Sequence, residues 1–209
     1  MQANLFDGEE TEASIEGLVY QPEFLTAEEE RALIEIIRTL PLHAAQYKQY
    51  EARRRVLSFG GSFDFDTNTL QPTSALDDRL RPLRQRVAQW LGVPDENLVH
   101  ALVSEYVPGT PLGWHRDVPN FEVICGVSLG GLGTMRFRPY PYKQMTASKT
   151  VQLSVEPRSI YKMEGPARWD WQHAVSPVRD LRWSITFRTP AVHAACRHRG
   201  GLVFDNSTA

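Results

Sequence analysis

The stretch LVHALVSEYVPGTPLGWHRD, residues 98–117, joins a strand-like run to a His-x-Asp pair through a loop rich in proline and glycine. The run Leu98–Val107 has the apolar and β-branched composition of a strand. In an extended chain, side chains two residues apart point in the same direction, so His115 and Asp117 can face one point. Because short motifs match by accident, the pair alone is more typical of an ordinary surface pair than of a metal site.

Strand patterns dominate the chain from residue 98 onward, and two helix patterns precede them. Thr26 and Glu29 form a predicted capping box for a helix that ends at Pro41, and Ser74–Leu91 is a second amphipathic helix. The expected strands are Ile15–Leu25, Leu98–Val107, Phe121–Leu129, Thr134–Arg138, Val151–Val155, Ser159–Met163, Asp170–Val175 and Leu181–Phe187. Two helices before a run of short strands predict an α+β fold, with the helices buttressing a β-sandwich or barrel.

The composition is that of a globular protein with one substantial core. The chain has 209 residues, of which 42% are hydrophobic and 23% charged, and this length suits a single domain. Its formal net charge of -2 provides no global positive field, so binding to nucleic acid would need a local basic patch. We expect a flexible lead-in at residues 1–14, one domain over 15–189 and an irregular tail at 190–209.

The sequence also predicts a compartment. Cys125 lies in an apolar run and is expected in the core rather than in a disulfide, which fits a reducing environment. No basic and apolar leader opens the chain, and no stretch approaches the ~18 apolar residues of a membrane span. We therefore expect a cytoplasmic monomer.

A third ligand for the His-x-Asp pair is predicted on a late strand. His173 lies in WQHAV, residues 171–175, between apolar and aromatic neighbours. The other histidines lie at a helix end, early on a strand or in the tail. Two histidines and one carboxylate form the facial triad that binds non-haem Fe(II) and leaves positions open for O2 and substrate. We expect His115, Asp117 and His173 to be the metal ligands.

The strand LRWSITFR, residues 181–188, carries two arginines six residues apart. This even spacing places Arg182 and Arg188 on one face, while the alternate residues form an apolar face. Two arginines on a buried strand destabilise the fold unless an anion compensates them, and each guanidinium can fork onto a carboxylate. The alternative is a salt-bridged pair on an exposed edge. Iron ligands beside a dicarboxylate clamp specify 2-oxoglutarate.

Taken together, these motifs resemble the AlkB family of Fe(II)/2-oxoglutarate dioxygenases. Tyr106 precedes His115 by nine residues, as a tyrosine does in that family, and the arginine strand ends in Thr-Phe-Arg as it does there. The resemblance covers roughly residues 15–189. It implies a double-stranded β-helix (jelly-roll) core under a nucleotide-recognition lid.

The resemblance also implies roles for particular residues. Arg182 would grip the far carboxylate of 2-oxoglutarate, helped by Tyr106 and Ser184, and Arg188 would steady the near carboxylate. With O2 as co-substrate, the enzyme would remove alkyl groups from bases of single-stranded or base-flipped DNA, or of RNA. Succinate, CO2 and an aldehyde would be released.

Several positions depart from the family pattern. Ser104 and Ser184 stand where asparagines are usual, although each can still donate a hydrogen bond. Pro119 replaces an acidic residue that contacts the damaged base in some members. These departures place the substrate in doubt more than the cofactor.

The segment RRRVLSFGGSFDFD, residues 53–66, allows two interpretations. It is either an edge hairpin whose phenylalanines face the core, which its residues favour when taken alone, or a lid over the site spanning about residues 50–70. The resemblance favours the lid, although its phenylalanines lack a hydroxyl that could hold a phosphate. The candidate substrate contacts are Phe59, Phe63, Phe65, Trp114, Arg168 and Trp169.

Three functions therefore compete. The first is oxidative dealkylation of nucleic acid. The second is a 2-oxoglutarate-dependent hydroxylase or demethylase of a protein or small molecule, which the net negative charge and Pro119 favour. The third is a binding module that has lost turnover, against which the complete set of ligand and clamp residues argues.

Overall fold

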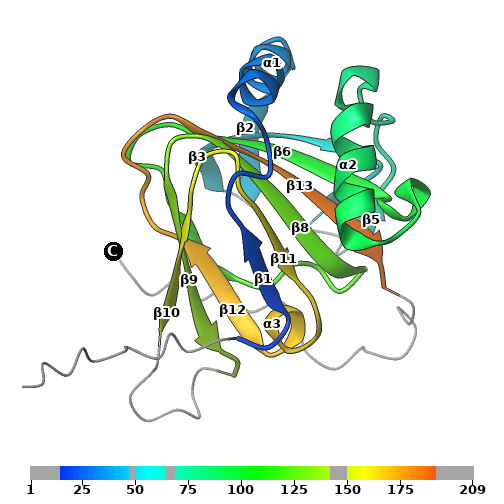
Figure 1. The fold of residues 1–209 in the computed structure, drawn as a ribbon. Coiled ribbons are helices and arrows are strands. Elements are labelled where there is room, and N and C mark those ends of the chain that lie inside the picture. Colours follow the sequence, from blue (N-terminus) through cyan, green and yellow to red (C-terminus); the bar gives the residue numbers. More distant parts are fainter. Residues whose placement is uncertain (1–14, 48–49, 65–68, 142–149, 192–209) are drawn as a thin grey trace, which may run out of the picture.

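Two antiparallel β-sheets make up most of the molecule (Figure 1). The structure, a computed structural model, describes residues 15–47, 50–64, 69–141 and 150–191. Across the larger sheet the strands are β1 (Leu18–Gln21), β11 (Ile160–Met163), β8 (Phe121–Gly130), β13 (Arg182–Pro190), β6 (His100–Tyr106), β3 (Tyr50–Phe59) and β2 (His43–Tyr47). Across the smaller sheet they are β10 (Val151–Val155), β9 (Gly133–Pro139), β12 (Trp171–Val175) and β7 (Leu112–His115). A separate hairpin pairs β4 (Ser62–Asp64) with β5 (Thr69–Gln71).

Helices cover the outer face of the larger sheet (Figure 1). They are α1 (Ala27–Arg38) and α2 (Arg81–Leu91), with 3-10 turns at Asp78–Leu80 and Asp95–Asn97. The short α3 (Gly165–Trp169) lies apart from them, beside β12, and its Ala167 is part of the core between the sheets. The capping box predicted at Thr26 and Glu29 is present, since each side chain bonds the other's backbone amide. Leu33 and Ile37 of α1 then pack into a core shared with α2 and the sheet. Burial of this apolar stripe holds the helices in place.

Strand β13 lies at the centre of the larger sheet and has two different faces. Trp183, Ile185 and Phe187 are buried in the core beneath the helices. The alternate residues, from Arg182 to Arg188, face the space between the two sheets. The predicted alternation along this strand is therefore confirmed, and β13 divides the apolar core from a polar interior.

A second apolar core fills part of the space between the sheets. Phe137 and Met135 of the smaller sheet meet Ile124 and Met163 of the larger one. Two facing antiparallel sheets with helices on one outer face form a double-stranded β-helix, as predicted. The remaining volume between the sheets is the pocket described below.

Some elements differ from the predictions. Residues 112–115, expected as loop, form β7, and α3 was not predicted. Helix α2 begins at Arg81 rather than at Ser74, because Pro82 suits the first turn of a helix and not its interior. Cys125 is buried, as predicted. Within the described ranges, no helix is long and apolar enough to cross a membrane.

The segment predicted as a lid is in part a strand of the larger sheet. Phe59, at the end of β3, is 6% exposed and packs in the core beneath the helices. The hairpin alternative, with phenylalanine facing the core, therefore holds for this residue, and Phe59 is not a substrate contact. Phe65 and the side chain of Phe63 lie outside the described residues, as do the lead-in at 1–14 and all of the tail beyond residue 191.

Candidate active site between the two sheets

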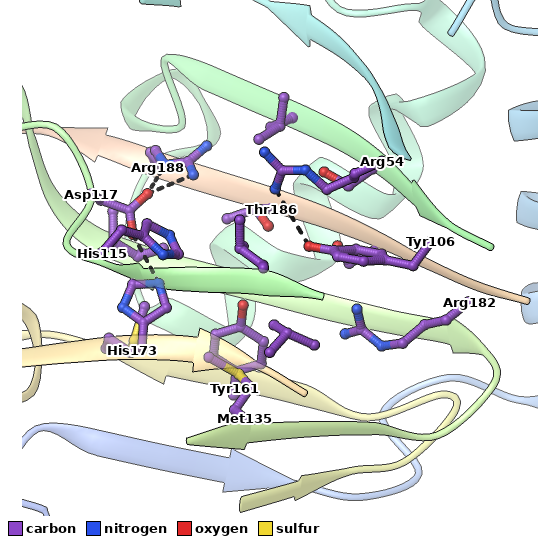
Figure 2. Close-up of a pocket in the computed structure, with 17 residues that line it drawn as sticks. Arg54, Tyr106, His115, Asp117, Met135, Tyr161, His173, Arg182, Thr186 and Arg188 are labelled. Atoms are coloured by element: carbon purple, nitrogen blue, oxygen red, sulfur yellow. Dashed lines mark hydrogen bonds and ion pairs between the residues drawn. The ribbon is translucent and has the colours of Figure 1, made fainter. Parts of the chain in front are cut away.

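Three side chains converge at one end of the pocket (Figure 2). His115 ends β7, Asp117 follows it, and His173 lies on the neighbouring strand β12, where it is the cross-strand partner of His115. The ligand atoms of the three residues all lie within 4.8 Å of one another. His173 Nε2 is 3.6 Å from Asp117 Oδ2. The fold thus brings the three predicted ligands to one point across 58 residues of sequence.

The protonation states of these groups suit metal binding. Burial lowers the pKa of His115 and lowers that of His173 to about 3, so both imidazoles are neutral at neutral pH. Burial alone would raise the pKa of Asp117, but the positive charges of Arg188 and Arg168 lower the pKa and keep the carboxyl ionised. Two neutral imidazoles and one carboxylate are the donor set of a non-haem Fe(II) site.

Neighbouring groups orient two of the three ligands. His115 Nδ1 donates to the carbonyl oxygen of Gly113 at 2.8 Å, which leaves its Nε2 available. Arg188 donates from Nε and Nη2 to Asp117 Oδ1, at 2.9 and 2.6 Å. Such partners fix the tautomer and the direction of a ligand and thereby raise metal affinity.

The pocket extends from the three ligands along β13 to Arg182 (Figure 2). It encloses about 470 Å³ of space between atoms, part of which is open to solvent. The residues that line it are Arg54, Leu102, Ser104, Tyr106, Leu112, His115, Asp117, Ile124, Met135, Tyr161, Met163, His173, Val175, Arg182, Ser184, Thr186 and Arg188.

Arg182 marks the far end of the pocket. It is 2% exposed, its Nε donates to Ser128 Oγ at 3.2 Å, and its guanidinium lies 5.2 Å from the centre of the Tyr106 ring. Among the described residues no carboxylate pairs with it. A buried guanidinium without an acidic partner destabilises the fold unless a ligand supplies the anion. The lining holds three arginines and one ionised carboxylate, which leaves two positive charges for an anion.

Comparison with known proteins decides the family. Residues 17–188 match the family described as the 2OG-Fe(II) oxygenase superfamily. The chain belongs to this superfamily. A 2OG-Fe(II) oxygenase uses Fe(II) and 2-oxoglutarate, and the donor set and the unpaired Arg182 both fit these cofactors.

The relatives to which this oxygenase is similar include AlkB-like proteins. Mouse tRNA (carboxymethyluridine(34)-5-O)-methyltransferase ALKBH8 is 27% identical over 92% of the chain, and the Arabidopsis thaliana alkylated DNA repair protein ALKBH8 homolog is 28% identical over 79%. The chain spans only 28% and 52% of these two proteins. The structure of OsALKBH1 aligns with a TM-score of 0.61 and 16% identity, covering 83% of this chain and 96% of that one. The structure of a Pseudomonas putida prolyl-4-hydroxylase aligns with a TM-score of 0.58 and 14% identity, and the alignment covers 84% of this chain and 93% of that one. These two structural likenesses concern the fold alone.

Of the predicted cofactor-binding residues, five line the pocket of this oxygenase. Ser104 and Ser184 are direct cross-strand partners on β6 and β13. Arg188, expected beside the near carboxylate of 2-oxoglutarate, lines the pocket and is bonded to Asp117, and its Nη1 lies 3.1 Å from His100 Nδ1. Its contacts support a role in holding the ligand Asp117.

The predicted substrate residues that the structure describes do not line the pocket. The guanidiniums of Arg136 and Arg138 lie over the Trp114 ring, at 5.1 and 4.5 Å from its centre. Trp169 donates from Nε1 to Glu122 at 2.9 Å. Arg168 is 3% exposed and bonds backbone carbonyls of the segment that follows Asp117. Each of these side chains is held by protein groups, so the expectation that they contact substrate is not supported.

Sequence reasoning missed three polar residues in the pocket. Thr186 lies between Arg182 and Arg188 on the same face of β13, so the even spacing that found the arginines also applies to it. Arg54 lies in the predicted hairpin or lid segment, where no local feature distinguishes it from its neighbours Arg53 and Arg55. Tyr161 lies in an apolar strand pattern, and no local feature distinguished its hydroxyl from an ordinary core tyrosine.

Proposed function

We propose that this chain is a dioxygenase that removes N-linked alkyl groups from nucleic-acid bases. One observation carries the proposal. The three iron ligands and the unpaired guanidinium of Arg182 lie at opposite ends of one pocket, along one face of β13. This arrangement suits a dicarboxylate that reaches from the metal to an arginine.

The residues of the chain would bind and orient the reactants. His115, Asp117 and His173 would hold Fe(II), and Arg182 and Tyr106 would bind the far carboxylate of 2-oxoglutarate. Ser184 would support Tyr106 through the hydrogen bond between their side chains. When bound, iron and 2-oxoglutarate supply the activation of O2 needed to hydroxylate an alkyl carbon. The overall reaction would yield the free base, an aldehyde, succinate and CO2.

Apolar walls would keep water from the reaction centre. Leu112, Ile124, Met135 and Val175 line the pocket around the ligands. Exclusion of water strengthens the electrostatic interactions inside a site and limits side reactions.

A nucleic-acid substrate is supported by the names of two relatives, which concern tRNA and DNA repair. Positive charge in the pocket supports it as well. Arg54 reaches the pocket from β3, its Nη1 lies 3.4 Å from the Tyr106 hydroxyl, and its buried Nε has no partner among the described groups. The alkylated base would have to be flipped out or presented on a single strand to reach the iron.

A protein or small-molecule substrate is the second candidate. Pro119 stands where some AlkB-like enzymes contact the damaged base, and the net charge is -2. The prolyl-4-hydroxylase aligns almost as well as OsALKBH1, so the fold is compatible with either substrate class.

Formaldehyde release tests the proposal. The purified protein, with Fe(II), ascorbate and 2-oxoglutarate, would be given single-stranded DNA and RNA oligonucleotides carrying N-methylated bases. We expect formaldehyde and succinate in equal amounts, and neither from the Asp117→Ala variant. Succinate production that no oligonucleotide increases, without formaldehyde, would favour the second candidate. Activity in the Asp117→Ala variant would contradict the assignment of Asp117 as a metal ligand.

A further inference from the structure

Tyr161 lies across its partner strand in a way that depends on one glycine. In the pairing of β11 with β8, Tyr161 is directly opposite Gly126. A Cβ atom at position 126 would lie 2.4 Å from Cζ and 2.5 Å from the hydroxyl oxygen of Tyr161. Contacts this short do not occur, so any larger residue at 126 would displace the ring. The absent side chain makes room for the phenol of Tyr161 inside the pocket.

The hydroxyl of Tyr161 points into the pocket, between the iron ligands and Arg182 (Figure 2). The residue is 7% exposed, and among the described residues its hydroxyl has no hydrogen-bond partner. Burial raises the pKa of Tyr161, so the phenol keeps its proton and remains a donor. In the unliganded pocket this donor is available to water, and a ligand that supplies an acceptor would take the place of that water.

The nearby groups indicate which acceptor this would be. Arg182 and the Tyr106 hydroxyl, which lie at the same end of the pocket, are both donors toward an anion. Arg182 Nε is used by Ser128, so its Nη atoms remain for a ligand. A carboxylate can accept about four hydrogen bonds. Two from the Nη atoms and one from each of two phenols would complete them.

We propose that Tyr161 is a binding residue for 2-oxoglutarate, donating its phenolic hydrogen bond to the carboxylate that Arg182 grips. Gly126 is the positioning residue that permits this contact. The inference rests on the proposed placement of 2-oxoglutarate between the iron ligands and Arg182, and it does not depend on the alkylated substrate.

The test uses Tyr161→Phe, which removes only the hydroxyl. The dissociation constant of 2-oxoglutarate would be measured by calorimetry on the Mn(II)-loaded protein, so that no turnover is needed. We expect binding to weaken about tenfold, the usual value of a hydrogen bond to a charged group. 2-Oxobutyrate, which keeps the keto acid but lacks the far carboxylate, should bind both proteins equally.

Each result has one meaning. Equal 2-oxoglutarate affinities, or equal weakening for both keto acids, would overturn the role of Tyr161. If the wild-type protein binds Mn(II) but not 2-oxoglutarate, that result would instead contradict the proposed placement of 2-oxoglutarate. Because the free hydroxyl has no partner, the melting temperature of the Mn(II) protein without 2-oxoglutarate should not fall in Tyr161→Phe. A large fall would indicate a structural role.

The glycine is tested by a double-mutant cycle. Gly126→Ala should weaken 2-oxoglutarate binding at least as much as Tyr161→Phe, because the ring must move. In a Tyr161→Leu background, where that ring is absent, Gly126→Ala should add no more than about twofold. A full additive loss in that background would show that Gly126 acts independently of Tyr161.

Discussion

Arg188 and Asp117 form a forked contact, with Nε and Nη2 of the arginine 2.9 and 2.6 Å from one carboxylate oxygen. The arginine is on β13 and the aspartate follows β7, so the contact joins the larger sheet to the segment that carries a predicted iron ligand. It leaves the second oxygen, Oδ2, facing His173 at 3.6 Å. The central strand of the fold thereby sets the direction of the carboxylate.

Arg188→Met should weaken metal binding by about 10- to 100-fold, as the loss of a group that orients a ligand usually does. The carboxylate would lose both the forked contact and the charge that most strongly lowers its pKa. Calorimetric titration with Mn(II) measures the effect without turnover. Arg31→Gln, which removes a positive charge from the exposed face of α1, is the control for net charge and should bind Mn(II) as the wild type does. An unchanged affinity in Arg188→Met would mean that Asp117 is held by other groups.

Arg182→Gln should weaken the binding of 2-oxoglutarate and leave the binding of metal unchanged. With its forked contact to the far carboxylate lost, the dissociation constant of 2-oxoglutarate should rise about 100-fold or more. Mn(II) affinity should remain within about twofold, because Arg182 touches no iron ligand. If Mn(II) and 2-oxoglutarate affinities fall together, the variant has disturbed the whole pocket and the clamp assignment loses its support.

The polar face of β13 could be predicted from the sequence because a strand has a strict period of two. Arg182 and Arg188 follow that period, and so does the apolar face that packs under the helices. The meeting of His115, Asp117 and His173, the proposed iron ligands, could be predicted because each residue type has a defined metal chemistry and because side chains two apart in an extended chain point the same way. These features depend on local spacing and residue type, which can be read from a single sequence.

Features that depend on distant partners could not be predicted. The position of Tyr161 requires a glycine 35 residues earlier, and only the register of β8 and β11 brings the two together. Arg168 was predicted to contact substrate. Its partners are carbonyls more than forty residues away, which no local spacing indicates.

Arg168 offers a prediction about stability. This side chain donates to the carbonyl oxygens of Phe121, Val118 and Asp117, at distances from 2.8 to 3.2 Å. Arg168→Met would remove these contacts, including the buried ones to the Phe121 carbonyl, although the Val118 carbonyl keeps its bond from the Phe121 amide. We expect the free energy of unfolding to fall by about 2–4 kcal/mol. Urea unfolding of the metal-free protein, followed by tryptophan fluorescence, measures the loss.

The matched control for Arg168 is Arg116→Met. Arg116 makes a single bond from Nη1 to the carbonyl of Trp169, at 3.0 Å, and it stacks on the Tyr140 ring. It is only partly buried, so its removal should cost less than about 1 kcal/mol. If both variants lose the same stability, the carbonyl contacts of Arg168 are not the source of its effect.

His100 allows a prediction about pH. Burial, with a contribution from Arg188, lowers its pKa to about 3, against about 6.5 for an unfolded histidine. The unfolded chain therefore binds a proton between these pH values that the folded chain does not, and stability must fall as pH falls from about 6.5 toward 3. His115 and His173, whose pKa values are lowered by burial, act in the same direction. In His100→Asn, whose amide oxygen can still accept from Arg188, the fall should be less steep, by up to about 1.4 kcal/mol for each pH unit. Urea unfolding at pH 7.5, 6.0 and 5.0 with EDTA present tests this, and parallel curves for the two proteins would show that His100 takes up a proton without unfolding.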